Sequence, residues 1–195
     1  THPGRKERSP MSMRTMADHL LDIAQNAINA GATSVRLTVE ETSRTFRFLV
    51  IDNGKGMDPA TVERVFDPFY TTREKKIRRF GLGLPFLREA ARMTGGDVRL
   101  QSEKGKGTEI EVLFRTDHID CQPVGDLGSV WFSLLSYSPD IRWHILRRYG
   151  EEEYEIDSVV FTQMTRSSED FYAPAFLQLM KESLQELEES IREKG

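Results

Sequence analysis

The segment with the clearest potential for ligand chemistry runs from Asp52 to Met57 and reads DNGKGM, directly after an apolar stretch. An aspartate at the end of a strand, beside two glycines, places a carboxylate at the floor of a cleft where the backbone can approach a ligand closely. That carboxylate can accept a hydrogen bond from an exocyclic amine such as N6 of adenine. By itself, the same segment also fits a plain Asp-Asn-Gly turn.

Two other segments offer groups suited to a cation and to an anion. Asp22 and Asn26 stand four residues apart and therefore share one face of a helix. The amide oxygen of Asn26 suits Mg²⁺, which favours oxygen ligands and often lies between protein and phosphates, and Asp22 can orient a water molecule. The segment 81–84, GLGL, follows a basic stretch and opens a predicted helix whose free N–H groups suit phosphate. As isolated signals, a solvated helix face and an ordinary glycine loop also explain these segments.

These residues need a framework that brings them together, and hydrophobic periodicity indicates which one. Apolar residues at steps of three and four predict a helix at 13–30. Alternating patterns predict strands at 34–40, 45–51, 97–102 and 108–115. Further helices are predicted at 59–66 and directly after GLGL. This order of elements predicts an α+β fold, a two-layer sandwich with one layer of sheet and one layer of helix, in which the first two strands form an antiparallel hairpin.

The sequence after Arg115 follows a different pattern of apolar and polar residues, which predicts a small α+β appendage. A short helix is expected at 126–137, and two strands at 141–149 and 153–161 are expected to form a hairpin around Gly150. A long helix is expected over 169–194. Its apolar stripe consists of Phe176, Leu177, Met180, Leu184, Leu187 and Ile191. The chain is therefore predicted to divide into a disordered lead at 1–12, a first domain at 13–116 and the appendage at 117–195.

Composition narrows the class of protein. Hydrophobic residues make up 38% of the chain and charged residues 30%, which is ordinary for a globular protein and argues against disorder. No apolar run reaches the roughly 18 residues of a membrane helix, and the polar first ten residues lack the core of a secretion signal. The single cysteine, Cys121, excludes an internal disulfide and fits a reducing compartment. We expect a cytoplasmic protein that has no membrane partner.

Charge is unevenly distributed along the chain, whose net charge is −4. Residues 151–195 hold 12 acidic and 4 basic side chains, a balance of −8, which leaves +4 for residues 1–150. The first part can therefore accept an anionic ligand, and the acidic last part can serve as an interaction surface. Nothing in this distribution calls for a nucleic-acid partner.

The order of the motifs is far more specific than any one of them. An asparagine on a helix is followed by DNGKGM, then FDPFYTT, then GLGL and finally KGKGTEIEV. In this order the chain resembles the Bergerat-fold (GHKL) ATPases, the superfamily of DNA gyrase, heat-shock-ninety chaperones, histidine kinases and the MutL mismatch-repair proteins. The likeness covers about half the chain and is greatest to the catalytic ATP-binding domain of sensor histidine kinases.

The resemblance implies a role for each matching residue, with ATP and Mg²⁺ as cofactors. Asn26 takes the place of the N-box Mg²⁺ ligand, and Asp22 takes the place where the gyrase branch keeps a general base. Asp52 corresponds to the residue that recognises the adenine base. Four further residues correspond to positions beside the adenine ring: Gly54, Gly56, Met57 and Thr108. The F-box, which anchors the lid, corresponds to Phe66, Phe69 and Tyr70. The beginning of the lid corresponds to Thr72 and Arg73. The G2-box that supports the phosphates corresponds to Gly81, Leu82, Gly83 and Leu84.

The resemblance also implies an activity. Only some dozen residues precede the N-box helix, too few for the two-helix phosphoacceptor hairpin of a sensor kinase. We therefore expect a stand-alone kinase-like ATPase that binds Mg-ATP and acts on a partner protein. Two alternatives stay open: a slow ATPase or nucleotide-gated switch in which Asp22 activates water, and a binding module that works through its acidic C-terminal surface. Ala30 stands where kinases often keep a basic phosphate contact, which predicts slow catalysis.

Overall fold

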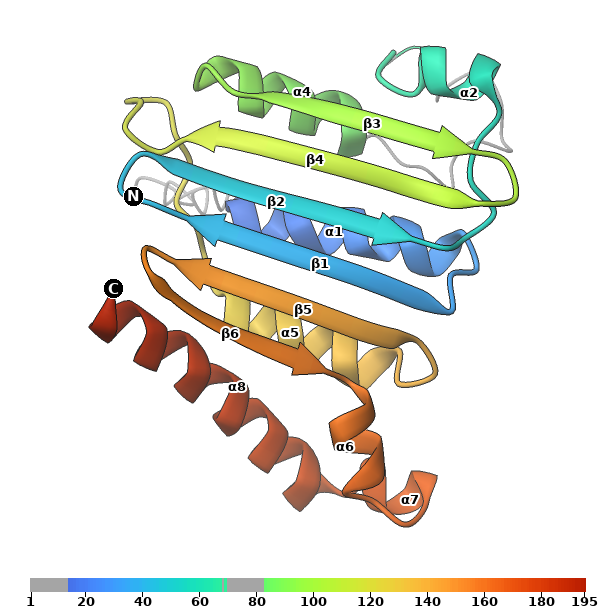
Figure 1. Cartoon of the computed structure of the whole chain (residues 1–195), viewed down its shortest axis with the longest axis vertical. Helices are drawn as coiled ribbons and strands as arrows, with labels where there is room; N and C mark the ends of the chain where they lie inside the picture. Colours follow the sequence, from blue (N-terminus) through green and yellow to red (C-terminus); the bar gives the residue numbers. More distant parts are fainter. Residues whose placement is uncertain (1–13, 68, 70–82) are drawn as a thin grey trace, which may run out of the picture.

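The protein is built on one six-stranded sheet, which a computed structural model describes together with its helices for residues 14–67, 69 and 83–195. The strands are β1 (Ser34–Glu41), β2 (Thr45–Asp52), β3 (Asp97–Glu103), β4 (Gly107–Arg115), β5 (Arg142–Tyr149) and β6 (Glu152–Asp157). They lie in the order β3-β4-β2-β1-β5-β6 (Figure 1). Neighbouring strands are antiparallel except for β1 and β5, which run parallel.

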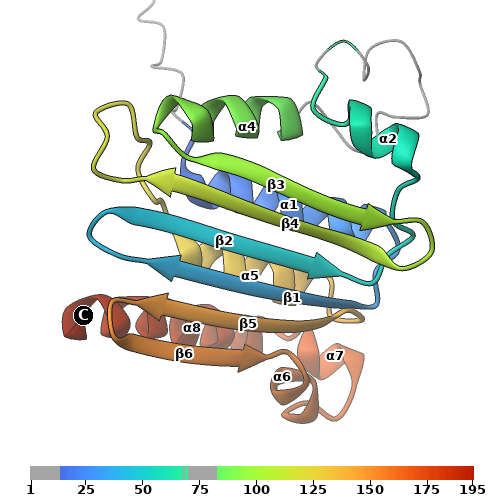
Figure 2. The same cartoon turned by 45° about the horizontal axis from the view of Figure 1, so that its top comes forward.

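Helices cover one face of this sheet and leave the other face open (Figures 1 and 2). They are α1 (Met16–Asn29), α2 (Pro59–Arg64), α4 (Gly83–Met93), α5 (Leu127–Tyr137), α6 (Val159–Gln163), α7 (Ser168–Phe171) and α8 (Pro174–Lys194). The four longer helices form a layer in the order α4, α1, α5, α8, because α1 contacts both α4 and α5 while α5 contacts α8. Within the described part of the chain, no helix is long and apolar enough to cross a lipid bilayer.

The core lies between the sheet and the helix layer because the side chains of each strand alternate between the two faces. The buried positions of β1 are Val35, Leu37 and Val39, and the intervening Arg36 and Thr38 face the open side. Helix α1 packs on the buried face with a stripe made of Met16, Ala17, Leu20, Ile23, Ala24 and Ala27. The alternating apolar residues of β1 and the apolar residues of α1 at steps of three and four therefore pack against each other, as their sequence patterns predicted.

The C-terminal segment joins the sheet through β5 and also contacts the start of α1. Strand β5 pairs with β1 so that Arg142 lies beside Ser34. The amide N–H groups of Met16 and Ala17 donate to the carbonyl oxygens of Pro123 (3.0 Å) and Val124 (2.8 Å). The first N–H groups of a helix have no acceptor within the helix, so this linker supplies the partners that α1 needs. Residues 117–195 thus share both layers with the residues before them.

The fold class predicted from the sequence is confirmed: a mixed sheet is packed against helices, and the hairpin of β1 and β2 is antiparallel. One strand prediction is too long. The strand expected at 153–161 ends at Asp157, whose carboxylate accepts a hydrogen bond from the Val159 amide (3.1 Å) at the beginning of α6. The lead expected at 1–12 lies outside the described residues.

The helix predicted at 169–194 is in fact two helices, α7 and α8. Pro174 has no N–H group and disfavours helical backbone in the residue before it, and Ala173 accordingly has φ −59° and ψ 132°. The buried stripe of α8 also differs from the prediction. Leu187 is 37% exposed, whereas Glu188 next to it is buried.

Glu188 belongs to a buried ionic group, which we call the Arg147 cluster: Glu41, Arg147, Tyr154, Glu188 and Arg192. Arg147 is fully buried and donates to Oε2 of Glu41 (2.5 Å) and to Oε1 of Glu188 (3.0 Å). The Tyr154 hydroxyl donates to the same Glu188 oxygen (2.5 Å), and burial followed by that carboxylate raises the pKa of the hydroxyl. Arg192, partly exposed, lies 3.3 Å from Glu41 and 3.6 Å from Glu188. Two carboxylates are matched by two guanidinium groups, as buried charge requires.

On the open face, one charged side chain from each strand belongs to a row that crosses the sheet. In sheet order the charge row consists of Arg99, Glu111, Arg47, Glu40, Arg148 and Glu153, with neighbours 3.9, 2.6, 2.6, 2.9 and 2.9 Å apart. Burial acts to raise the pKa of Glu40, but hydrogen bonds from Arg47 and Arg148 hold it below its ordinary value. The positive and negative charges of the row balance each other and keep this face polar, as suits a sheet face without a second covering layer.

Candidate functional site

The candidate site begins at the end of β2, where Asp52 lies opposite Thr108 of β4. The Asp52 carboxylate is half-buried, and its Oδ1 accepts a hydrogen bond from the Gly54 amide (2.8 Å). Burial raises the pKa of this carboxyl group, and hydrogen bonds from the backbone N–H groups of Gly54 and Thr108 counteract part of the rise. A fixed, partly desolvated carboxylate of this kind can accept a further hydrogen bond from a ligand amine.

Glycines allow the loops around Asp52 to pack closer than any other residue permits. A Cβ at Gly54 would lie 2.8 Å from the Cβ of Ala30, at the end of α1. Gly56 has φ +61°, and a Cβ there would overlap the carbonyl oxygen of Glu103. Gly107 has φ +123°, and a Cβ there would overlap the carbonyl oxygen of Asp52 itself. The glycines therefore shape the floor of the site, and Gly107 is a participant that the sequence analysis did not single out.

A small hydroxyl network supports the same floor. Ser102 Oγ accepts a hydrogen bond from the Met57 amide (2.8 Å), lies 2.8 Å from Thr108 Oγ1 and 3.0 Å from the Gly107 carbonyl oxygen. The Met57 side chain is buried and anchors the loop to the core. Thr108 is partly exposed. Sequence reasoning missed Ser102, whose only signal is a hydroxyl on the core-facing side of β3.

The side chain of Asn53, the second residue of DNGKGM, forms hydrogen bonds with other residues of the protein. Its Oδ1 accepts hydrogen bonds from the amides of Thr33 and Ser34 (both 2.9 Å), and its Nδ2 donates to Thr33 Oγ1 (2.9 Å). The Lys55 amide donates to the Ala30 carbonyl oxygen (2.9 Å). These bonds hold the loop after β2 against the turn between α1 and β1.

Helix α1 brings Asp22 and Asn26 to the neighbourhood of this loop. The helix begins with a reciprocal capping box between Thr15 and Asp18. Asp22 Oδ2 forms an ion pair with Arg14 Nη1 (2.9 Å), and both side chains are about half exposed. Asn26 is partly exposed, and its carboxamide has no hydrogen bond to any residue that the structure describes.

The start of α4 lies beside α1. A Cβ at Gly83 would lie 4.0 Å from Asp22 Oδ2, so the segments predicted to bind Mg²⁺ and phosphate are brought together. Leu84 is buried in the core and supports α4 from its inner side. Phe66 is half-buried beneath the guanidinium of Arg88, 4.6 Å from its ring centroid, which fixes the end of α2 to α4.

The remaining predicted contacts are in the lid region. Phe69 is 74% exposed, so its side chain does not pack into the core. Tyr70, Thr72, Arg73, Gly81 and Leu82 lie outside the described residues. The described part of the site therefore contains the residues predicted to contact adenine and Mg²⁺, with α4 at its border.

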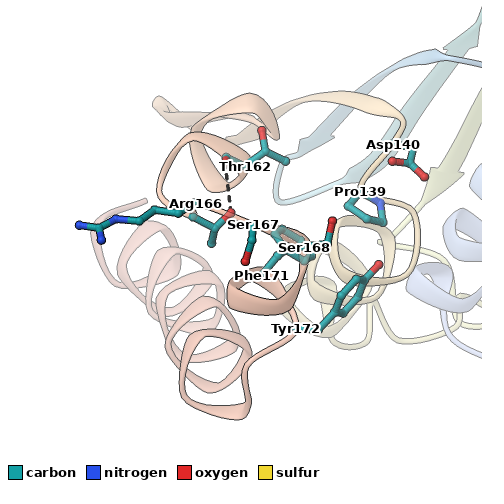
Figure 3. A pocket seen from close by; sticks show the side chains of 9 residues that line it. Pro139, Asp140, Thr162, Arg166, Ser167, Ser168, Phe171 and Tyr172 are labelled. Atoms are coloured by element: carbon teal, nitrogen blue, oxygen red, sulfur yellow. Dashed lines mark hydrogen bonds between the residues drawn. The ribbon is translucent and has the colours of Figure 1, made fainter.

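A cavity of about 430 Å³ lies between the α5–β5 loop and the turn from α6 to α7, and its lining residues come from the C-terminal third of the chain (Figure 3). Asp140 lines it on one side, and Ser168, Phe171 and Tyr172 line it on the other, while the Arg166 side chain points away. None of the residues predicted to bind nucleotide line this cavity. It is therefore separate from the site at the end of β2.

The end of β2 suits a flat ring with an exocyclic amine, and the asparagine of α1 together with the glycine at the start of α4 suits the metal and phosphates attached to it. That combination, on a sheet covered by helices on one face, defines an ATP-binding domain of the histidine-kinase type. Residues 10–118 match the family described as histidine kinase-, DNA gyrase B- and HSP90-like ATPase. The chain belongs to this family.

Several curated proteins are similar over the same region. A putative sensor protein from Shewanella frigidimarina is 37% identical over 98 residues, covering 49% of this chain and 15% of that protein. The sensor protein kinase FleS from Pseudomonas aeruginosa is 41% identical over 96 residues, covering 48% and 23%. Sporulation kinase D from Bacillus subtilis is 28% identical over 109 residues, covering 53% and 21%. The chain thus spans less than a quarter of the length of each of these relatives.

Gly107 allows a direct test of the packing around Asp52. We expect Gly107→Ala to lower the free energy of unfolding by more than the roughly 1–3 kcal/mol of a strained backbone alone, because its Cβ also overlaps the Asp52 carbonyl oxygen. Gly105→Ala is the matched control, since Gly105 has φ +83° in the same turn but has no atom within 4 Å of its Cβ position. Strain alone then costs about 1–2 kcal/mol. Equal losses in chemical denaturation would show that the Asp52 carbonyl does not constrain Gly107.

Proposed function

We propose that this chain binds Mg-ATP at the end of β2 and acts as a kinase-like domain that transfers the γ-phosphoryl group to a residue on a partner protein. The observation that most supports ATP binding is the Asp52 carboxylate, held by the Gly54 amide at 2.8 Å beside loops that only glycine can form. Partial burial strengthens the hydrogen bond that this carboxylate would accept from the adenine amine. Residues 10–118, which match the family, contain this arrangement.

Asn26 is proposed as the protein ligand of Mg²⁺. Its carboxamide is partly exposed and makes no hydrogen bond to the described residues, so its oxygen is available. One amide oxygen, nucleotide phosphates and water are an acceptable ligand set, because Mg²⁺ keeps several waters and shares its sphere with phosphates. When bound, the ion would neutralise phosphate charge, while Asn26 would fix its place relative to α4.

Asp22 distinguishes the proposed phosphotransfer from hydrolysis. The carboxylate lies close to Gly83 at the start of α4, and this position supports the second candidate function, a slow ATPase or nucleotide-gated switch. However, the same Oδ2 atom is paired with Arg14 at 2.9 Å, so the guanidinium occupies an acceptor position that an attacking water molecule would need. The ion pair therefore favours phosphotransfer over water activation.

Binding calorimetry with ATP, in the presence and absence of Mg²⁺, tests the proposed site. We expect Mg²⁺ to tighten ATP binding to the wild type, and Asn26→Ala to remove about tenfold or more of that effect by loss of one metal ligand. Asn29→Ala is the matched control, because Asn29 lies on the exposed side of the same helix and, among the described residues, its side chain is hydrogen-bonded only to Gln25 (3.5 Å). An Asn26→Ala variant with unchanged Mg²⁺ dependence would contradict the assigned ligand.

The hydrolysis rate of Asp22→Asn then separates the two functions. Phosphotransfer predicts that ATP binding and the slow background hydrolysis both stay close to the wild-type values. Loss of hydrolysis with intact ATP binding would instead support the ATPase alternative, since removal of a general base typically costs about 10²–10⁴-fold.

A further inference from the structure

The open face of the sheet has a hollow near the strand ends that carry Asp52. This open-face trough has a volume of about 490 Å³, and the lining residues used below are Ser34, Arg36, Asp52, Lys106, Arg142 and His144. Arg36 alternates with the buried Val35 and Leu37 and therefore points away from the helix layer. The trough thus lies on the side of the sheet opposite to α1 and the proposed Mg²⁺ ligand.

The trough has an excess of positive charge. Arg36, Lys106 and Arg142 line it. Asp52 borders it, but its carboxylate, held by the Gly54 amide, is on the helix-covered face, because Asp52 pairs with the buried Val35. Lys106 pairs with Glu103 at 2.7 Å, but both side chains are mostly exposed, so this pair contributes little. Arg142 uses Nη2 to pair with Asp157 (2.7 Å).

Arg36 differs from the other arginines of the sheet's open face. Its guanidinium has no hydrogen bond or ion pair with any residue that the structure describes. By contrast, Arg47, Arg99 and Arg148 are each paired within the charge row. An arginine left unpaired in a hollow, on a face where the neighbouring charges are matched, is suited to an external anion.

The strand register brings two arginines to one place. Ser34 lies beside Arg142, and Arg36 lies beside His144, so Arg36 and Arg142 are diagonal neighbours on adjacent parallel strands. Long side chains at diagonal positions of adjacent strands can reach each other, so the two guanidinium groups can converge on one tetrahedral oxyanion. The Ser34 hydroxyl adds a further donor at the same edge.

We propose that the open-face trough is a phosphate-binding site, distinct from the nucleotide pocket and formed chiefly by Arg36 and Arg142. Its ligand is a phosphate group, free or carried on a small molecule. Phosphate is favoured over carboxylate because its three or four oxygens can engage both guanidinium groups at once. The inference does not depend on the proposed kinase function, because no residue assigned to Mg²⁺ or to phosphoryl transfer lines the trough.

The experiment is a titration of the full chain with inorganic phosphate in chloride buffer, followed by the imidazole NMR resonances of His144. We expect a saturable change, both in the nucleotide-free protein and in protein saturated with ADP. Acetate at equal concentrations is expected to give no saturation. Added salt should weaken phosphate binding, because the trough is open to solvent.

Variants assign the effect to the trough. Arg36→Ala is expected to weaken phosphate binding about tenfold or more, equivalent to about 1.4 kcal/mol. Arg36→Lys should lie between that variant and the wild type, because lysine keeps the charge but loses the planar fork. The matched control is Arg99→Ala, an open-face arginine that is 83% exposed and outside the trough, and its phosphate affinity should stay close to the wild-type value.

Three results would overturn the proposal. They are no saturation by phosphate, equal phosphate affinity of the Arg36→Ala and Arg99→Ala variants, or loss of the His144 response when ADP is bound. The last result would place the phosphate in the nucleotide pocket. Acetate binding as tight as phosphate binding would also contradict the assigned ligand. Thermal melting of each variant confirms that a loss of binding does not reflect a loss of fold.

Discussion

Asp52→Asn is expected to weaken ATP binding about a hundredfold, equivalent to about 2.8 kcal/mol. The asparagine keeps an oxygen that can accept the hydrogen bond from the Gly54 amide, which Asp52 Oδ1 accepts at 2.8 Å. It also presents an NH₂ group where the carboxylate had a free acceptor, so a donor meets the adenine amine, which is itself a donor. Calorimetry with ATP and ADP measures the loss directly.

The same substitution should not destabilise the nucleotide-free protein. Burial raises the pKa of the Asp52 carboxyl group on folding. A carboxyl of this kind stabilises the fold below its ordinary pKa and loses that contribution as the pH rises through the raised pKa. At neutral pH its ionised form is therefore a cost, which asparagine removes. Loss of ATP binding together with unchanged or higher stability distinguishes a binding residue from a structural one.

Asp117→Asn is the control for a lost negative charge. Asp117 is an exposed carboxylate paired with Arg115 (3.2 Å), beyond the far end of β4 from Thr108. Its variant should bind ATP as the wild type does. If Asp52→Asn does so as well, Asp52 is not the adenine acceptor. If the wild type itself binds no nucleotide, the pocket motifs act as scaffold or require a partner to complete them.

Arg147→Met is expected to lower the free energy of unfolding by about 3–5 kcal/mol. Arg147 is fully buried and bonds both carboxylates of the Arg147 cluster, at 2.5 Å and 3.0 Å. Methionine fills much of the volume but leaves Glu41 and Glu188, among the described residues, with the partly exposed Arg192 as their remaining counter-charge. Urea denaturation, read from the tryptophan fluorescence, measures the change.

Two further variants show that the effect comes from buried charge. Arg142→Met changes another arginine of β5 that also forms an ion pair (2.7 Å), but its side chain is 63% exposed, so the loss should be about 1 kcal/mol or less. Adding Glu188→Gln to Arg147→Met should restore part of the stability, because one uncompensated carboxylate is removed. Similar losses for the two arginine variants would refute the central position of Arg147.

The sequence predicts those features whose cause is local. A Cβ at Gly54 or Gly56 of DNGKGM would meet neighbouring atoms, so these glycines mark close packing of the backbone at the end of β2, and their close approach to a ligand stays a prediction. Pro174 could also have been used, because a proline after Ala173 marks the beginning of a helix and not its interior. The boundary between α7 and α8 is therefore encoded locally, and the prediction of one helix over 169–194 is wrong.

Other features depend on partners that are remote in sequence. The hydroxyl of Ser102 matters because β3 and β4 bring it to Thr108 and to the Met57 amide. Arg147 occupies a core-facing position of β5, and its partners come from β1 and α8. Alternation shows that a charged side chain is buried there, but only the sheet order shows which carboxylates accept from it. The paired state of Asp22 likewise depends on Arg14, which lies eight residues earlier, before the start of α1.

The parallel pairing of β1 with β5 has a consequence for how the chain folds. The hairpin of β1 and β2 can form early, since its strands are neighbours in sequence, whereas Ser34 meets Arg142 only after a long loop has closed. Until then β1 has an exposed edge that can pair with other chains, and α1 lacks the carbonyl partners at Pro123 and Val124. Long-range parallel pairing is slow, so we expect it to limit the folding rate. The nucleotide pocket would then reach its final form last, through strands that lie beyond the residues matching the ATPase family.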